Sequence, residues 1–150
     1  MIELWTDGSC IGNGKANNSG GWAFVAVQDS KIVYNRYGSE KDTTNNRMEM
    51  TAVIEAMKYA NEVADLDEEI IVKSDSAYVV NCILDGWYHR WRLYQYEGVK
   101  NPDLWKKLID LYECFGQNIR FEKVKGHKGI VNNEIVDMLA KKGSQEARNK

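Results

Sequence analysis

Residues 21–37 read GWAFVAVQDSKIVYNRY, and this stretch decides which fold the rest of the chain can complete. Its first eight residues are mostly apolar and rich in side chains that favour strands. Asp29-Ser30 is a turn signal, and KIVYNRY forms a second run of the same kind. The stretch therefore predicts a β-hairpin whose strands span residues 21–28 and 31–37.

The residues before the hairpin predict a third strand. Residues 2–6 alternate apolar and polar side chains and run into Asp7-Gly8. From Gly8 to Gly21 there are five glycines and three asparagines, a composition that predicts a loop. Three strands in succession favour an antiparallel unit, because short connections join antiparallel neighbours.

After the hairpin, apolar residues recur at the spacing of a helix. Met50, Val53, Ile54 and Met57 share one face of a helix predicted for residues 45–64. Strands separated by helices favour parallel addition to the same sheet. The sequence therefore predicts an α/β fold with a five-stranded mixed sheet, three antiparallel strands followed by parallel ones, and helices on both faces. The remaining strands are predicted at residues 69–74 and 118–124, and the remaining helices at residues 77–84, 103–115 and 133–145.

Length and composition indicate one folded domain. A chain of 150 residues, 43% of them apolar, can bury a core, and we expect a single domain over residues 1–150 with a frayed tail at 144–150. No run of about 18 apolar residues is present for a membrane span. The cysteines Cys10, Cys82 and Cys114 form no CxxC pair, which argues against disulfides and zinc. We therefore expect a reduced, cytoplasmic protein with no membrane partner.

The charged residues are unevenly distributed along the chain. The net charge is −2, but residues 86–128 carry nine Lys or Arg and five Asp or Glu, a local net of +4. The other residues therefore carry a net of −6. Such a division fits a basic patch beside a site that needs carboxylates, and it also occurs without any function.

Four acidic residues lie at the ends of predicted elements. Asp7 and Asp75 close the first and fourth strands, and Glu49 and Asp137 lie in the first turns of two helices. If the two strands are parallel neighbours, their carboxyl ends meet where open α/β sheets bind ligands. Four carboxylates in one crevice would favour hard cations such as Mg²⁺, and two ions can clamp both the attacking and the leaving oxygen of a phosphodiester.

Each of these acids also has a purely structural interpretation. Asn46 and Glu49 have the spacing of a helix capping box. Asp137 is favoured in a first helical turn by the helix dipole. Asp7 and Asp75 can be ordinary turn residues, because each precedes a small residue. Spacing alone leaves both interpretations open.

Five segments of the sequence lie in one order along the chain and together cover nearly all of it. The segments are TDGSCIGN (6–13), TTNNRMEM (43–50), SDSAYV (74–79), NPDLW (101–105), and VKGHKG with NEIVDMLA (124–129 and 133–140). Together they resemble the ribonuclease H type 1 family. The resemblance implies the ribonuclease H-like fold and an endoribonuclease that cleaves the RNA strand of RNA/DNA hybrids by two-metal-ion hydrolysis. Two Mg²⁺ ions, for which Mn²⁺ can substitute, are the implied cofactors, and the implied products have 5′-phosphate and 3′-hydroxyl ends.

The resemblance also assigns roles to the acids and to two further residues. Asp7 would bridge both ions, Glu49 and Asp75 would hold the ion on the leaving-group side, and Asp137 would hold the ion that activates water. His127, in a glycine-flanked segment, would assist proton transfer or product release, for which an ordinary histidine pKa near 6.5 is suitable. Glu134 would act alongside it.

Contacts with both strands of a hybrid are implied in the same way. Thr44 would supply a hydroxyl to a pocket for a DNA-strand phosphate. Backbone groups and short amides suit the 2′-hydroxyls of a shallow groove. The residues that would follow the RNA strand are Cys10, Gly12, Asn13, Asn45 and Asn46.

The chain departs from the family in the part that would hold DNA. Many relatives carry an Arg seven residues before the helix-borne Glu, where this chain has Asp42. Arg90 is the predicted substitute, because its guanidinium can hold a phosphate with two hydrogen bonds, and Lys41 is the second candidate. An aromatic stripe at Trp87, Trp91 and Tyr94 is typical of a core, but the interleaved cations favour a substrate edge.

Two other functions remain open. One is another nuclease of the same superfamily, such as a Holliday-junction resolvase, although such enzymes lack the TTNNRME and GHKG motifs together. The other is an inactive hybrid-binding module, in which we would expect at least one of the four acids to be lost. The sequence favours a monomeric enzyme that removes RNA from hybrids during DNA replication and repair.

Overall fold

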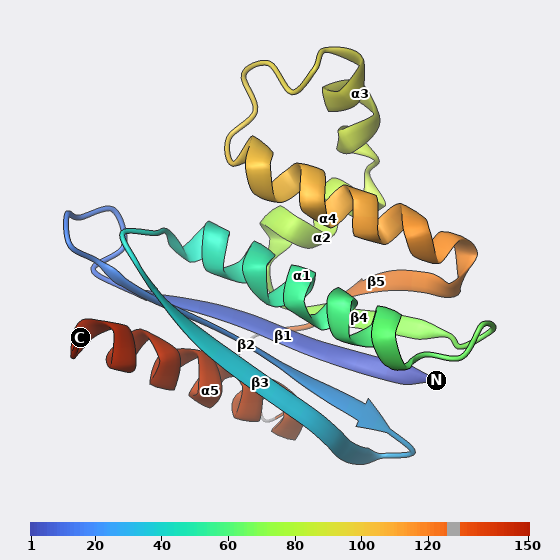
Figure 1. The fold of residues 1–150 in the computed structure, drawn as a ribbon, viewed down its shortest axis with the longest axis horizontal. Helices are drawn as coiled ribbons and strands as arrows, with labels where there is room; N and C mark the ends of the chain where they lie inside the picture. Colours follow the sequence, from blue (N-terminus) through green and yellow to red (C-terminus); the bar gives the residue numbers. More distant parts are fainter. Residues whose placement is uncertain (126–129) are drawn as a thin grey trace.

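The computed structural model describes residues 1–125 and 130–150 and has a five-stranded sheet in the order β3-β2-β1-β4-β5 (Figure 1). Helix α5 covers one face of this sheet, and α1, α2 and α4 cover the other. None of the helices in these ranges has the length and hydropathy of a membrane span. The elements are β1 (Ile2–Ile11), β2 (Ser19–Gln28), β3 (Lys31–Lys41), α1 (Asn45–Val63), β4 (Ile70–Ser74), α2 (Ala77–Leu84), α3 (Trp87–Leu93), α4 (Pro102–Phe115), a 3₁₀ helix (Gly116–Asn118), β5 (Ile119–Lys123) and α5 (Val131–Arg148).

The three antiparallel strands are confirmed, but they are longer than the sequence indicated. β1 and β2 pair as far as Ile11 and Ser19, so only residues 12–18 connect them and the loop predicted from Gly8 to Gly21 is wrong at both ends. The glycines misled the prediction because Gly20 also lies within β2, next to Gly21, which lies directly under α5. A Cβ atom at Gly21 would collide with the carbonyl oxygen of Ala140, so the glycine permits a close approach of helix and strand.

The parallel additions to the sheet are also confirmed. β4 pairs parallel with β1 from Ile2/Ile70 to Thr6/Ser74, and β5 pairs parallel with β4. The prediction that Asp7 closes β1 is wrong, because β1 continues to Ile11, with β2 as its only partner strand beyond Thr6. The pairing of β1 with β4 nevertheless ends at Thr6 and Ser74, so Asp7 and Asp75 each directly follow the last paired residue.

The core has two parts, one on each face of the sheet. The larger lies under α1, α2 and α4 and includes the fully buried Trp105, against which Trp91 packs edge-on with ring centroids 5.1 Å apart. The smaller lies under α5 and includes Trp5 and Val136. The two helix layers thus bring α1 and α5 to β1 from opposite sides, which positions the carboxylates described below.

The end of the chain is not the frayed tail predicted for residues 144–150. Helix α5 continues to Arg148, and Ser144 and Ala147 are each only 1% exposed. The Tyr37 hydroxyl donates a hydrogen bond to Glu146 Oε1 at 2.8 Å, which ties the helix to β3. The prediction failed because the buried face here consists of small residues, which carry no apolar periodicity in the sequence.

Candidate active site

Three carboxylates meet where the pairing of β1 with β4 ends. Asp7 comes from β1, Glu49 from α1, and Asp75 from the residue after β4. One carboxylate oxygen of each lies within 4.8 Å of the others. Asp7 and Glu49 are 4% and 5% exposed, and Glu49 Oε2 has no hydrogen-bond partner among the described residues. Oxygen ligands in this arrangement fit a hard divalent cation, which would satisfy that buried oxygen.

The approach of α1 to β1 brings Glu49 to Asp7. Thr44 is the N-cap of α1, because its hydroxyl accepts a hydrogen bond from the backbone N–H of Arg47 at 3.1 Å. The capping-box interpretation of Asn46 and Glu49 therefore does not hold. At Gly8 a Cβ atom would collide with the backbone nitrogen of Glu49, so the glycine lets the helix reach the strand. The Asp7-Gly8 pair lies within β1 and forms no turn.

Burial and mutual repulsion change the protonation of these acids. The pKa of Asp7 rises to about 8, mainly because the carboxylate is buried and then because Asp75 is negatively charged. The pKa of Glu49 rises well above its ordinary value, again through burial first and then through Asp7 and Asp75. Without a cation the group therefore retains protons near neutral pH. A bound cation would favour the charged forms and release those protons.

Asp137 joins this group from the other face of the sheet. It lies in the second turn of α5, not the first as predicted, because the helix begins at Val131. It contributes to the raised pKa of Asp7, so the two side chains interact. Its Oδ2 atom lies 3.0 Å from Lys141 Nζ. Sequence reasoning missed Lys141, although its spacing of four residues from Asp137 on one helix could have revealed the pair.

The four acids line a hollow of about 490 Å³, which we call the carboxylate hollow. Three residues predicted to follow RNA, Cys10, Asn45 and Asn46, line it as well. Burial raises the pKa of the Cys10 thiol, which argues against a thiolate nucleophile. The complete lining is Asp7, Gly8, Ser9, Cys10, Asn45, Asn46, Glu49, Asp75, Ser76, Ala77, Tyr78, Asp137 and Lys141.

Gly12 and Asn13, the other predicted RNA contacts, lie at the edge of this region. Both are exposed in the connection between β1 and β2. The side-chain oxygen of Asn13 accepts a hydrogen bond from the backbone N–H of Asn45 at 3.0 Å, which ties the connection to the start of α1. Of the remaining predictions, Glu134 is exposed in the first turn of α5, and His127 lies outside the described residues.

A second hollow, of about 520 Å³, lies beside α3, and we call it the α3 hollow. The aromatic stripe predicted here divides: Trp91 packs into the core, whereas Trp87 and Tyr94 are 46% and 57% exposed. Trp87 does not line the hollow, but Arg90 does. Tyr78 lines both hollows, so they adjoin at its ring. The complete lining is Tyr78, Arg90, Trp91, Tyr94, Glu97, Gly98, Val99 and Lys100.

Comparison with known proteins agrees with this geometry. The family model described as RNase H matches residues 1–145. A ribonuclease H of Syntrophomonas wolfei is 43% identical, over 93% of this chain and 93% of its own. The solved structure of LC9-RNase H1, described as a type 1 RNase H with the type 2 active-site motif, has a TM-score of 0.82 and 26% identity, over 97% of this chain and 72% of its own. The structure of LC11-RNase H1 in complex with an RNA/DNA hybrid has a TM-score of 0.73 and 22% identity, over 98% of this chain and 99% of its own.

The sheet order and the acidic hollow at the end of β1 and β4 define a nuclease-type hydrolase. The chain belongs to the RNase H family and is a ribonuclease H.

Proposed function

We propose that the chain cleaves the RNA strand of RNA/DNA hybrids as an endonuclease, by two-metal-ion hydrolysis that leaves 5′-phosphate and 3′-hydroxyl ends. The observation that carries this proposal is the convergence of Asp7, Glu49 and Asp75 with one buried Glu49 oxygen unpartnered among the described residues. The hybrid bound to LC11-RNase H1, a protein of the same fold, supports the substrate class.

The acids of the carboxylate hollow are suited to two Mg²⁺ ions, for which Mn²⁺ can substitute. Asp7, Glu49 and Asp75 would hold one ion, and Asp7 with Asp137 would hold the other. Bound ions of this kind lower the pKa of water and stabilise charge on a phosphodiester. The protein's own part is to fix the four carboxylates on rigid elements, with Asp7 on β1, Asp75 directly after β4, and Glu49 and Asp137 on helices.

The polar lining of the carboxylate hollow is suited to RNA. Asn45 and Asn46 place short amides beside the acids, and Cys10 lies in the same lining. The connection that holds Gly12 and Asn13 is fixed to α1, so these groups form one continuous edge. Such groups can contact 2′-hydroxyls, which distinguish RNA from DNA.

The DNA strand would cross the neighbouring α3 hollow. Arg90 lines this hollow and is exposed, so its guanidinium can reach a phosphate. Trp87 is exposed at the start of α3, where its ring can stack on a sugar or base. Thr44 caps α1 through its hydroxyl oxygen, which leaves the hydroxyl hydrogen available to a phosphate.

His127 and Glu134 would assist the four acids. His127 would move a proton or assist product release, and Glu134, exposed in the first turn of α5, would act alongside it. Residues 1–150 would form one domain that acts as a cytoplasmic monomer in DNA replication and repair.

The decisive experiment offers labelled RNA/DNA hybrid, duplex RNA and duplex DNA in parallel, with Mg²⁺, with Mn²⁺ and with chelator. We expect cleavage of the RNA strand of the hybrid alone, and only with metal. Cleavage of duplex DNA would favour another nuclease of the superfamily. Binding of hybrid without any cleavage would favour an inactive hybrid-binding module. The presence of all four acids favours the enzyme.

A further inference from the structure

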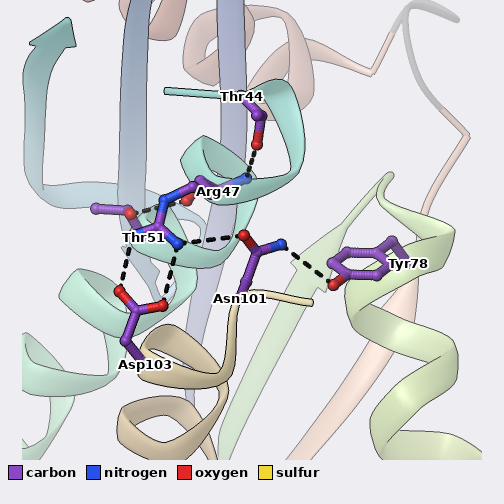
Figure 2. Close-up of polar contacts among 6 residues, drawn as sticks. All are labelled: Thr44, Arg47, Thr51, Tyr78, Asn101 and Asp103. Atoms are coloured by element: carbon purple, nitrogen blue, oxygen red, sulfur yellow. Dashed lines mark hydrogen bonds and ion pairs between the residues drawn. The ribbon is translucent and has the colours of Figure 1, made fainter. Parts of the chain in front are cut away.

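A hydrogen-bonded network centred on Arg47 joins three helices (Figure 2). The Arg47 guanidinium forms two hydrogen bonds with the Asp103 carboxylate, at 3.1 and 2.8 Å. The same guanidinium donates to the side-chain oxygen of Asn101 at 3.1 Å. The Asn101 amide nitrogen donates to the Tyr78 hydroxyl at 3.3 Å. The network therefore links the start of α1 to the start of α4 and to α2.

The ends of this network lie at functionally different places. Arg47 is two residues before Glu49 on α1, so it belongs to the segment that supplies a carboxylate. Tyr78 is three residues after Asp75 and lines both hollows. Trp105 of α4 also donates to the Tyr78 hydroxyl, at 3.0 Å. The hydroxyl of Tyr78, a residue that lines both hollows, is thus held by two donors from the start of α4.

The α3 hollow is attached to the rest of the molecule through α4 and through α2, which directly precedes α3 in the chain. Figure 1 shows α3 beyond α4, away from the sheet. Trp91 packs on Trp105, and the Arg92 guanidinium pairs with Glu113, so α3 is fixed to α4 at two points. The position of the α3 hollow therefore depends on how α4 is held against α1.

Arg47 is well suited to hold that junction. Its planar guanidinium satisfies Asp103 and Asn101 at once, which a lysine ammonium could not do with the same geometry. Hydrogen bonding to Arg47 lowers the pKa of Asp103 to about 2, so the pair stays charged across the working pH range. Asn101 has a left-handed backbone with φ 58°, a conformation that Asn tolerates better than most residues.

We propose that Arg47 is a positioning residue that fixes the α3 hollow against the carboxylate hollow, so that a hybrid reaching both is held in register for cleavage. This role rests on the proposed function, because it requires a substrate long enough to occupy both hollows. Arg47 itself lines neither hollow. Loss of Arg47 should therefore reduce the gain in kcat/KM that a longer hybrid gives and leave the chemistry at the carboxylates intact.

The test compares wild type with Arg47→Gln on hybrids lengthened stepwise from a minimal cleavable duplex. We expect kcat/KM to rise with length in wild type and to lose about 5- to 10-fold on the longest hybrid in the variant. On the shortest hybrid the two proteins should agree within about twofold. Arg120→Gln is the matched control, because it removes one Arg charge and its surface pairs with Glu69 and Glu122, and Arg120 lines neither hollow.

A second variant and a second readout make the result independent of folding and of activity. Asp103→Asn removes the other half of the pair without altering α1, and we expect the same length dependence in weaker form. Amide hydrogen exchange of residues 94–101 should become about 5- to 10-fold faster in Arg47→Gln and stay unchanged in Arg120→Gln. Equal losses at every substrate length, or unchanged exchange at 94–101, would overturn the positioning role. Absence of cleavage by wild type would refute the proposed function instead, and the exchange measurement would still decide the role of Arg47.

Discussion

Lys141 Nζ lies 3.0 Å from Asp137 Oδ2, one helical turn further along α5. A cation from the protein thus occupies one side of a carboxylate that we assign to metal binding. The Lys141 side chain is 59% exposed and that of Asp137 is 18% exposed, so the pair is of the weak, partly solvated kind. Metal would have to compete with this ammonium for the charge of Asp137.

We therefore expect Lys141→Gln to lower the Mg²⁺ concentration that gives half-maximal cleavage by about 2- to 5-fold, as the loss of one weak ion pair implies. Lys142→Gln is the control, because the Lys142 ammonium lies over the Tyr37 ring, with Nζ 5.3 Å from the ring centroid. The measurement is a Mg²⁺ titration at saturating hybrid. A higher Mg²⁺ requirement in Lys141→Gln would show that the lysine assists metal or phosphate binding.

In the metal-free protein, the carboxylate hollow should lower the free energy of unfolding. In Asp7→Asn a buried carboxyl group, whose raised pKa reflects burial and repulsion by Asp75, is replaced by a neutral amide of the same shape. We expect this variant to lose all cleavage and to unfold, in chelator, with a free energy about 1 kcal/mol higher than wild type. Denaturant unfolding monitored by tryptophan fluorescence checks the second part. A variant clearly less stable than wild type would contradict strong repulsion among the acids.

The raised pKa of Asp7 also predicts a pH dependence. The folded state keeps a proton up to about pH 8, whereas the unfolded chain loses it near the ordinary value of 3.8. The free energy of unfolding should therefore fall as pH rises from about 4 to about 8, by several kcal/mol in chelator. Asp7→Asn should flatten this profile, and saturating Mg²⁺ should do so as well. Identical profiles for wild type and variant would contradict the shift.

His127 should affect turnover more than metal binding. We expect His127→Ala to slow steady-state cleavage by about 10- to 100-fold, less than most proton-transferring groups contribute, because bound metal would itself activate the water. Substitution of a metal-binding acid should abolish cleavage. Single-turnover and steady-state rates distinguish chemistry from product release. If His127→Ala is inactive although it binds Mg²⁺ like wild type, the histidine is as essential as the acids.

The exposed Arg90 in the α3 hollow should hold a DNA-strand phosphate in place of the Arg that relatives carry at position 42. We expect Arg90→Ala to weaken hybrid binding by about 1–3 kcal/mol and to reduce its salt dependence by about one phosphate contact. Lys41→Ala should do less, because the Lys41 ammonium is bound to the carbonyl oxygen of Lys150. Asp42→Arg should tighten binding. Unchanged affinity and salt dependence in Arg90→Ala would mean that another group holds the DNA strand.

The hairpin and the change of apolar period were enough to predict the mixed sheet, and they place Asp7 and Asp75 side by side on the condition that their strands are parallel neighbours. Close approaches of backbone were not predictable, because a glycine in a strand and a glycine in a loop look alike in the sequence. The loop prediction therefore includes Gly20, although it lies within β2 in close contact with Thr43 and Met48. The buried faces of Ser144 and Ala147 were missed for a related reason, since small residues give no apolar signal.

The cap of α1 shows a different limit. Both Thr44 and Asn46 are good N-cap residues, and only the backbone conformation decides between them. The predicted aromatic stripe does not act as one surface, because Trp91 packs against Trp105, which lies fourteen positions further along the chain. Such choices depend on tertiary neighbours that a local pattern does not contain.

The joining of β1 and α5 has a consequence for how the molecule acquires its activity. Asp7 is on the first strand and Asp137 on the last helix, so the loop that must close before they meet comprises most of the chain. Contacts of such long sequence separation form late and slowly, because the entropy of closing the loop is lost before they contribute. Partly folded forms would therefore lack a complete set of acids and would leave nucleic acid intact. Nuclease activity would appear only when the chain has finished folding.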